Sequence, residues 1–548
     1  MDKKFVYYSD FGAVGDGVTN DFEAIREAHI YANENHLPVK ADGTKTYYIS
    51  DTEKDGVARY IPVKTDTDFS GAHFVIDDRE IYHIMGAGQK NWNTPIFKVL
   101  SYYDQVTIDE DIVKKIGSLK TTTTKIDVGL GYPAMLIVYN ENHRVYIRYG
   151  ANANTGAPQH ELVVIDKDGN VDPTTPIMHD YKELTKIEAV RIDIPTLTIE
   201  NGVFTQRASN VNSTITLPDG TTKKYTSGFK RNILVSRSNT ILRKIDNYNV
   251  DEISIEDQAK GITGPAYQGF FSAGTANNVL ITDCVVSARR YYAPGTYGFG
   301  ATLTNNIVLK NCHQENFYIK DENGNDTTVM SMEFHPLTNK PVRWGLGGTN
   351  YCKNMVYDGC EITRFDAHAG LCNGKIINSK ITMINLIGTG DMLIENSRIE
   401  LKDDTIFNLR PDYGSTWDGT ITIKDCLVAP NDTVKVKDEL TVCNMKWINH
   451  DFGYRCVIPN LVLDNVRFSK DVPVHIIQYK KLDDKSDSAV SEPNIHLPIL
   501  SDGVTENKNP MVPPKFIKVI NNEGGLNILA KDLKFFENTE LIGLTHEE

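Results

Sequence analysis

The feature of this chain that most restricts its fold is a short strand-like segment that recurs through its second half. Each copy alternates apolar and polar residues and ends in Asn, Asp or Gly followed by a small residue. Alternation with a period of two is typical of a β-strand with one buried face. The copies are NVLITDC (278–284), NIVLKNC (306–312), NMVYDGC (354–360), GKIINS (374–379), MLIENS (392–397), TITIKDC (420–426) and LVLDNV (461–466).

The spacing of these copies indicates a solenoid. Their ends are separated by 28, 48, 19, 18, 29 and 40 residues. A minimum of 18–19 residues with variable additions fits a coil that carries loops of different length. Such a coil cannot bury its strands alone and must stack on its neighbours, with about 4.8 Å between parallel strands.

The chain has eight cysteines, and none precedes position 284. No CxxC pair is present, and no His-rich segment completes a zinc pattern. Their placement after strand-like runs is expected of small buried residues. We therefore expect eight free thiols, no disulfide, no metal site and no cofactor. Those that end a repeat copy are Cys284, Cys312, Cys360 and Cys426.

Charge and hydropathy restrict the classes of partner. The formal net charge is −14, so the basic patch that nucleic acid binding requires is not expected. The longest apolar run, PAMLIVY, is too short to cross a membrane. The first residues, MDKKFVYYSDFG, lack the apolar segment of a signal peptide. We expect neither nucleic acid binding nor membrane insertion.

Near the N-terminus, DFGAVGDGVTND precedes an amphipathic helix pattern. Asn20 is expected to cap this helix, and Glu23 to complete a capping box. This stretch resembles the N-terminal cap of the pectate-lyase superfamily of right-handed parallel β-helices. The resemblance implies an all-β solenoid of that class with an N-terminal helical cap. One face of the helix is marked by Ala24, Ile25, Ala28 and Tyr31.

The pattern between the cap and the repeat is less regular. AMLIVYNENHRVYIRYG is expected to form two strands around a polar turn. The expected organisation is therefore a loop and capping helix over 1–34, a parallel β-helix over 35–525, a β-rich insertion over about 100–230, and a C-terminal tail over 526–548.

Two Arg-x-Asp triplets indicate a candidate site. They are RFD at 364–366 and RPD at 410–412. Asp366, Asn385 and Asp412 lie 13, 12 and 14 residues before the ends of their repeat copies. The counts predict a ladder on successive coils, with Asn385 between the two carboxylates. Two coil rises would separate the carboxylates by roughly 9–10 Å.

Carboxylates about 6.5–9.5 Å apart suit an inverting glycosidase. In this interpretation Asp366 and Asp412 are the acid and the base, and His368 is a third catalytic candidate. The neighbouring residues include aromatic faces for sugar rings and polar forks for hydroxyls or carboxylates. The substrate-binding candidates are Arg343, Trp344, Arg364, Asn385, Arg410, Tyr413, Trp417 and Asp418.

A structural alternative stands beside this interpretation. Asn and Asp rungs often serve solenoid turns, where their side chains bond backbone N–H groups. His368 taken alone is more often a packed or turn histidine. Trp417 taken alone is as often a core residue as a ligand contact.

The stretch from 262 to 430 is similar to a broad group of bacterial and phage β-helix proteins. The similar segments are GPAYQGFFS, RWGLGGTNYCKN, RFDAHAGLCN and LRPDYGSTWDG. The superfamily acts mainly on polysaccharides, as hydrolases or lyases. The polygalacturonase pattern of NTD, DD with GHG, and RIK is absent, as is the calcium-binding Asp cluster of pectate lyases. The resemblance therefore implies the fold and leaves the reaction open.

Three functions stay open. A glycoside hydrolase, acting on a bacterial or plant polysaccharide and carried on a phage tail spike or not, would use the two ladder carboxylates. A polysaccharide lyase would abstract the C5 proton of a uronate with Tyr413 or His368 and neutralise the carboxylate with Arg343 or Arg410. A non-catalytic virion protein would only bind the glycan, as a homotrimer or with other virion proteins. All three imply an extracellular or virion-associated protein with a polysaccharide or oligosaccharide partner.

Overall fold

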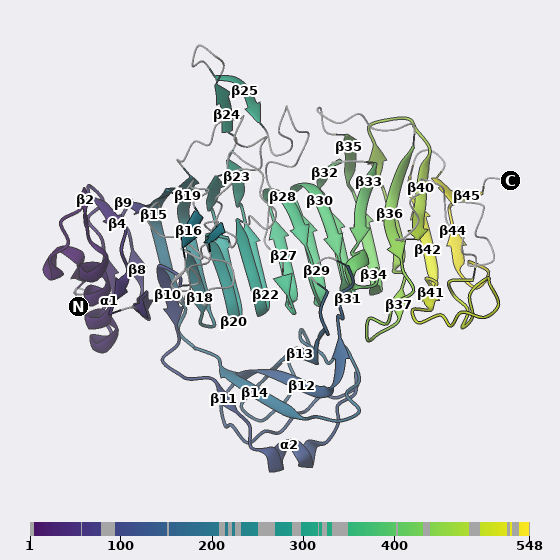
Figure 1. Ribbon diagram of the computed structural model, residues 1–548, viewed down its shortest axis with the longest axis horizontal. Coiled ribbons are helices and arrows are strands. Elements are labelled where there is room, and N and C mark those ends of the chain that lie inside the picture. Colours follow the sequence, from purple (N-terminus) through teal and green to yellow (C-terminus); the bar gives the residue numbers. More distant parts are fainter. Residues whose placement is uncertain are drawn as a thin grey trace.

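The computed structural model shows one long parallel sheet that winds along the molecule (Figure 1). The expected right-handed parallel β-helix is confirmed. The structure describes residues 5–546 except 56, 78–93, 151–152, 208–213, 217–221, 225–231, 250–268, 288–297, 316, 321–325, 331–348, 402–403, 431–438, 482–493, 523–525 and 529–535.

The aligned repeat copies lie on one face of the solenoid, as predicted. β29 (Leu371–Ile377) pairs in parallel with β27 (Lys353–Asp358) on one side and with β31 (Gly388–Glu395) on the other. Each coil therefore satisfies its backbone hydrogen bonds against its two neighbours. The series continues through β34 (Trp417–Lys424), β38 (Asn460–Asp464), β42 (Phe516–Ile520) and β44 (Glu540–Ile542).

The polar residue that ends each copy turns the chain. Asn378 and Asn396 have φ angles of 52° and 47°, in the left-handed region that Asn tolerates better than most residues. Their amides also join successive coils. Asn396 Nδ2 donates to Asn378 Oδ1 at 2.7 Å, and Asn378 Nδ2 donates to Asp358 Oδ1 at 2.9 Å. The left-handed backbone conformation of the turn thus explains why the repeat has Asn, Asp or Gly at this position.

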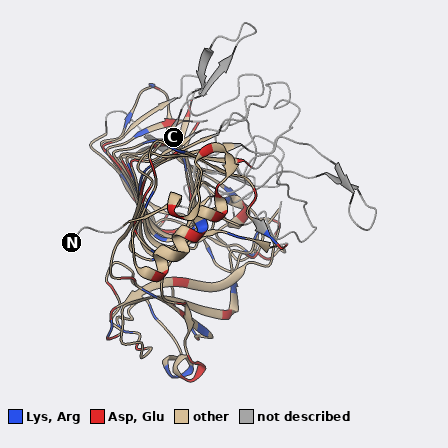
Figure 2. Cartoon of the chain, turned by 90° about the vertical axis from the view of Figure 1, so that its left-hand side faces the viewer, with Lys and Arg blue, Asp and Glu red and all other residues tan. Residues whose placement is uncertain are grey.

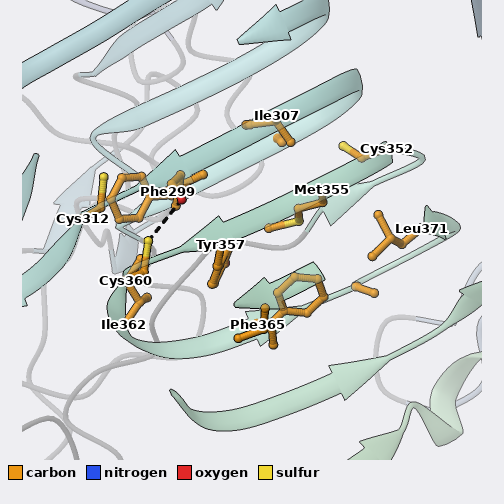
Figure 3. Close-up of a cluster of buried hydrophobic side chains, with 14 of the residues drawn as sticks. Phe299, Ile307, Cys312, Cys352, Met355, Tyr357, Cys360, Ile362, Phe365 and Leu371 are labelled. Atoms are coloured by element: carbon orange, nitrogen blue, oxygen red, sulfur yellow. Dashed lines mark hydrogen bonds between the residues drawn. The ribbon is translucent and has the colours of Figure 1, made fainter. Parts of the chain in front are cut away.

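The small residue that follows each turn points into the core. Figure 3 shows Cys312 and Cys360 among the aromatic and aliphatic side chains of neighbouring coils. Cys360 Sγ donates to the Leu309 carbonyl of the preceding coil at 3.2 Å. The Ser379 hydroxyl takes the equivalent place one coil later. All eight cysteines are buried and free, as expected.

We expect thiol titration to find eight reactive thiols in denaturant and almost none in the native protein. Burial excludes the reagent and keeps the thiols protonated; it raises the pKa of Cys426 to about 11. Counting with a chromogenic disulfide reagent, with and without guanidinium, measures both values. Fewer than eight thiols in denaturant would contradict the free-thiol assignment.

The N-terminal helix α1 (Phe22–Asn35) differs in its details from the expectation. Its N-cap residue is Asp21, whose carboxylate accepts hydrogen bonds from the backbone of Val14 and Gly15 in the preceding loop. Because the carboxylate holds the loop, no capping box forms, and Glu23 instead pairs with Arg59 at 2.6 Å. Figure 2 shows α1 at the near end of the solenoid, with acidic and basic positions interspersed along the ribbon. Tyr31 is exposed, and the buried face consists of Phe22, Ile25, Ala28, His29, Ala32 and Asn33.

An antiparallel β-sheet is inserted between two solenoid strands and lies against one side of the solenoid (Figure 1). Its residues 134–145 form one strand with an irregularity between Asn140 and Arg144, so the predicted hairpin there is wrong. The polar stretch bulges because Asn140 accepts a bond from the backbone of Asn142. Its elements are β11 (Val106–Thr107), α2 (Glu110–Ile116), β12 (Ala134–Val145), β13 (Ala157–Ile165) and β14 (Lys186–Arg191).

Two expected boundaries differ from the observed elements. β15 (Leu197–Arg207) pairs in parallel with solenoid strand β19 (Thr240–Asn249), so the solenoid resumes well before residue 230. At the C-terminus, β43 (Leu526–Ile528) pairs in parallel with β45 (Thr545–His546). Strand stacking thus continues beyond residue 525, where a tail was expected. None of the helices that the structure describes has the length and apolarity to cross a bilayer.

A buried ion pair joins the insertion to the solenoid. Lys353 Nζ in β27 lies 2.9 Å from Glu161 Oε2 in β13, and neither side chain is more than 2% exposed. Lys353 also donates to the Pro176 carbonyl at 2.8 Å. Glu161 accepts from the backbone N–H groups of Met178 and His179. The pair therefore meets the condition that buried charges be paired and hydrogen-bonded.

Replacing one partner of this pair should loosen the insertion. Lys353→Met leaves the Glu161 carboxylate buried without a counter-charge, which typically costs about 3–5 kcal/mol. We expect a lower unfolding midpoint and faster proteolysis within 106–191. The double variant Lys353→Met/Glu161→Gln should recover most of the loss. Equal proteolysis of the single variant and the wild type would contradict this role.

Candidate functional site

Asp366 begins a polar ladder on the solenoid. It lies opposite Asn385 in a parallel strand pair, as predicted. The next rung is Asn408, followed by Asn444 and Gln478. The strands that carry these residues are β28 (Glu361–Asp366), β30 (Lys380–Leu386), β33 (Thr405–Leu409), β36 (Leu440–Trp447) and β40 (Val474–Lys481).

Asp412 is not a rung of this ladder, so the register count was wrong at its third position. It lies in the 3₁₀ turn η2 (Pro411–Tyr413), which follows β33. Pro411 has no N–H to donate to a strand ladder, so the strand ends before it. The turn closes at Gly414, whose φ of 89° few other residues adopt. The two Arg-x-Asp triplets therefore have different backbone conformations.

The two carboxylates are nevertheless linked through a shared arginine. Arg410 Nη1 lies 3.7 Å from Asp366 Oδ2, and Arg410 Nη2 lies 2.6 Å from Asp412 Oδ2. Arg364 pairs with Asp366 at 2.5 Å. Arg148, from the insertion, pairs with Asp412 at 2.9 Å. We call Arg364, Asp366, Arg410, Asp412 and Arg148 the charged row.

The charged row favours an ionised Asp412. Burial alone would raise the pKa of Asp412, but its hydrogen bond to Arg410 and the charges of Arg410 and Arg148 lower it below the ordinary 3.8. Asp366 is fully buried, and its Oδ1 has no hydrogen-bond partner within the described residues. Three arginines face two carboxylates, so the row carries a formal excess of positive charge. This balance suits contact with an anionic or strongly hydrogen-bonding ligand.

A histidine and a tyrosine adjoin the row. His368 Nδ1 lies 3.0 Å from Asn350 Oδ1. An amide oxygen only accepts, so Nδ1 carries the proton and Nε2 keeps its lone pair. Burial, and then the charge of Arg410, lowers the pKa of His368 to about 4. The Tyr413 ring packs against His368 at 5.7 Å and against the Arg410 and Arg148 guanidinium groups.

The remaining candidates lie elsewhere. Trp417 is fully buried and donates through Nε1 to the Gly390 carbonyl at 2.9 Å, so it cannot offer its face to a sugar. Asp418 is exposed on β34 and is not part of the charged row. Arg343 and Trp344 lie outside the described residues.

The insertion contributes residues that the sequence reasoning missed. Tyr146 contacts the rings of Tyr454 at 5.0 Å, Tyr351 at 5.6 Å and Tyr413 at 6.4 Å. We call these four side chains the tyrosine cluster. The alternation of aromatic and basic residues in YIRY (146–149) was the available signal. It had been assigned to an ordinary hairpin strand.

The described part of the chain has no cluster of side chains that could form a metal-binding site. No group of three or more His, Cys, Asp or Glu side chains there is arranged to hold a metal ion.

Comparison with known proteins gives one local sequence match and several distant similarities of fold. No family model matches the chain. Over 116 residues it is 28% identical to a protein of Klebsiella phage P510 described as "Depolymerase, capsule KL64-specific"; the match covers 19% of this chain and 11% of that protein. The tailspike protein gp49 from Pseudomonas phage LKA1 has 10% identity and a TM-score of 0.49, over 98% of this chain and 84% of that one.

The Gp54 tailspike of Acinetobacter baumannii bacteriophage AP22, solved with a capsular saccharide, has 9% identity and a TM-score of 0.46, over 98% of this chain and 79% of that one. Because these identities and TM-scores are low, the fold is assigned from the strand pairing of the chain itself. It is a parallel β-helix. The resemblance inferred from the N-terminal stretch and the repeat holds at the level of the fold.

The partly buried, neutral His368 should make folding pH-dependent. Its pKa is about 4 in the folded state against an ordinary 6.5. A depressed folded-state pKa gives stability that is complete above about pH 6.5 and is lost as the pH falls towards 4. In chemical denaturation at several pH values, the wild type should lose more unfolding free energy over this window than His368→Gln. Parallel pH profiles of the two proteins would contradict the assignment.

Proposed function

We propose that this chain is a polysaccharide depolymerase of a phage tail spike that binds and cleaves a bacterial capsular glycan. The observation that carries the proposal is the local match to a capsule-specific phage depolymerase. The β-helix supports it, because stacked coils present long rows of side chains to an extended polymer. A virion-associated homotrimer is part of the same proposal. The polysaccharide screen described below is designed to identify the sugar and the linkage.

The charged row is the proposed cleavage site. It combines two carboxylates and three arginines from the solenoid and the insertion, and a neutral histidine, His368, and a tyrosine, Tyr413, adjoin it. In hydrolysis the ionised Asp412 would act as the base, and Asp366 would be the acid. Asp366 is fully buried and lies against Arg364 and Arg410, so an acid role requires that a bound substrate displace these arginines.

A lyase is the second candidate, and His368 is the observation that favours it. The imidazole is neutral at pH 7, and its Nε2 has no partner among the described residues. A neutral imidazole can take the C5 proton of a uronate while arginines neutralise the sugar carboxylate. The excess of arginine in the row fits this chemistry. A lyase product carries a conjugated double bond, whereas hydrolysis yields only a new reducing end.

Purified protein should be screened against a panel of capsular polysaccharides that includes the KL64 type, reading reducing ends and ultraviolet absorbance together. For a hydrolase, Asp366→Asn and Asp412→Asn should each lower turnover by about 10²–10⁴ with glycan binding retained. For a lyase, His368→Gln should cause the comparable loss and absorbance should rise in the wild type.

Asp471→Asn is the matched control, because Asp471 is exposed and lies outside the charged row. Each variant is first checked for a wild-type unfolding midpoint, since Asp412 also pairs with Arg148. Unchanged turnover in all three variants would remove the charged row and His368 from the mechanism. Binding without cleavage of any glycan would reduce the proposal to a glycan-binding tail protein.

A further inference from the structure

A cavity of about 220 Å³ lies between the insertion and the solenoid, next to the tyrosine cluster. Tyr146, Tyr351 and Tyr454 form part of its wall. Tyr146 also contacts Tyr413, which packs against Arg410 of the charged row. The rings of Tyr146 and Tyr413 therefore lie between the cavity and the charged row. The polar and charged lining includes His143, Gln159, His160 and His179 from the insertion, and Asp418 and Arg455 from the solenoid.

The wall of the cavity is built by close approach of the two parts of the chain. The His160 ring lies 4.2 Å from the Tyr351 ring, centroid to centroid. Gly370 has a φ of 63°, and a Cβ there would come within 2.8 Å of Tyr351 and 3.0 Å of Tyr146. A residue with a side chain would therefore push the rings out of place. The lining thus depends on Gly370 as well as on the docking of the insertion.

Several polar groups of this cavity are left for a ligand. His160 Nδ1 lies 2.7 Å from the Pro158 carbonyl, to which it can only donate, so Nε2 is an acceptor. Burial lowers the pKa of His160, which keeps the ring neutral, and raises the pKa of Tyr351 to about 12, which keeps its hydroxyl a donor. Asp418 and Arg455 are exposed, and neither forms an ion pair within the residues that the structure describes.

We infer that this cavity binds one neutral hexose unit of the polysaccharide, and so helps to determine which glycan is accepted. Aromatic walls suit a sugar ring, and a carboxylate, a guanidinium and a neutral imidazole suit its hydroxyls. The volume far exceeds the roughly 10–15 Å³ that one water needs. It is below the roughly 300–1,000 Å³ of pockets for larger ligands.

Charge decides between a neutral and an acidic sugar. Asp418 and Arg455 carry opposite charges, and the partly buried, neutral His160 adds none. A uronate would gain from Arg455 and lose against Asp418, so net charge does not favour it. The inference rests on the proposed function for its polymer, but sugar binding by the cavity can be measured without cleavage.

The test uses the full chain with free monosaccharides. Saturation-transfer NMR with D-galactose, D-glucose, D-mannose and D-glucuronate reports weak binding of each. At least one neutral hexose should give a signal that D-glucuronate does not, and Asp418→Ala and Arg455→Ala should each abolish it. Asp471→Ala and Arg467→Ala, both exposed and outside the cavity lining, are the matched controls. On a cleaved polysaccharide the two cavity variants should raise KM about tenfold, with kcat unchanged.

The outcomes separate this inference from the proposed function. Polysaccharide cleavage without any monosaccharide signal, or a signal that survives both cavity substitutions, overturns the cavity site and leaves the depolymerase standing. A stronger signal from D-glucuronate than from any neutral hexose overturns the choice of sugar. A hexose signal lost in both variants, with no polysaccharide cleaved, supports the cavity and contradicts the depolymerase.

Discussion

The structure depends on one constraint: the backbone of each coil finds its hydrogen-bond partners in the coils before and after it. β29, for example, is satisfied only between β27 and β31. Stacking therefore places equivalent residues of successive coils in rows about 4.8 Å apart. Inside, these rows are apolar residues and small thiols or hydroxyls. Outside, they include the Asn378–Asn396 ladder, whereas the ladder that continues through Asn385 begins at the fully buried Asp366.

The candidate site arises where the chain departs from this regularity. One departure is η2, which lifts Asp412 out of the strand register and lets Arg410 reach both carboxylates. The other is the inserted sheet, which is held by the buried Glu161–Lys353 pair and delivers Arg148 and Tyr146. A regular solenoid offers rows of single residue types. These two departures together combine acids, arginines and aromatic rings at one place.

Electrostatics limits what the charged row can do in the unbound protein. Arg410 and Arg148 keep Asp412 ionised, while burial keeps His368 neutral. Asp412 and the adjoining His368 are therefore both present as bases at neutral pH. Either a substrate rearranges the arginines around Asp366, or the chemistry is proton abstraction by His368. The choice between hydrolase and lyase therefore depends on whether a substrate separates Asp366 from its arginines.

Local patterns in the sequence determined the solenoid, the buried free cysteines, the left-handed Asn turns and the Asp366–Asn385 rung, because each depends on residues within one or two coils. Tertiary structure decided the rest. Pro411 ends β33, whereas the register count predicts that the strand continues to Asp412. The core encloses Trp417. The packing of the insertion against the solenoid brings Arg148 to Asp412. That last contact joins segments far apart in the chain. The geometry of this contact depends on how the inserted sheet packs against the coils. The periodicity of residues within either segment does not predict that packing.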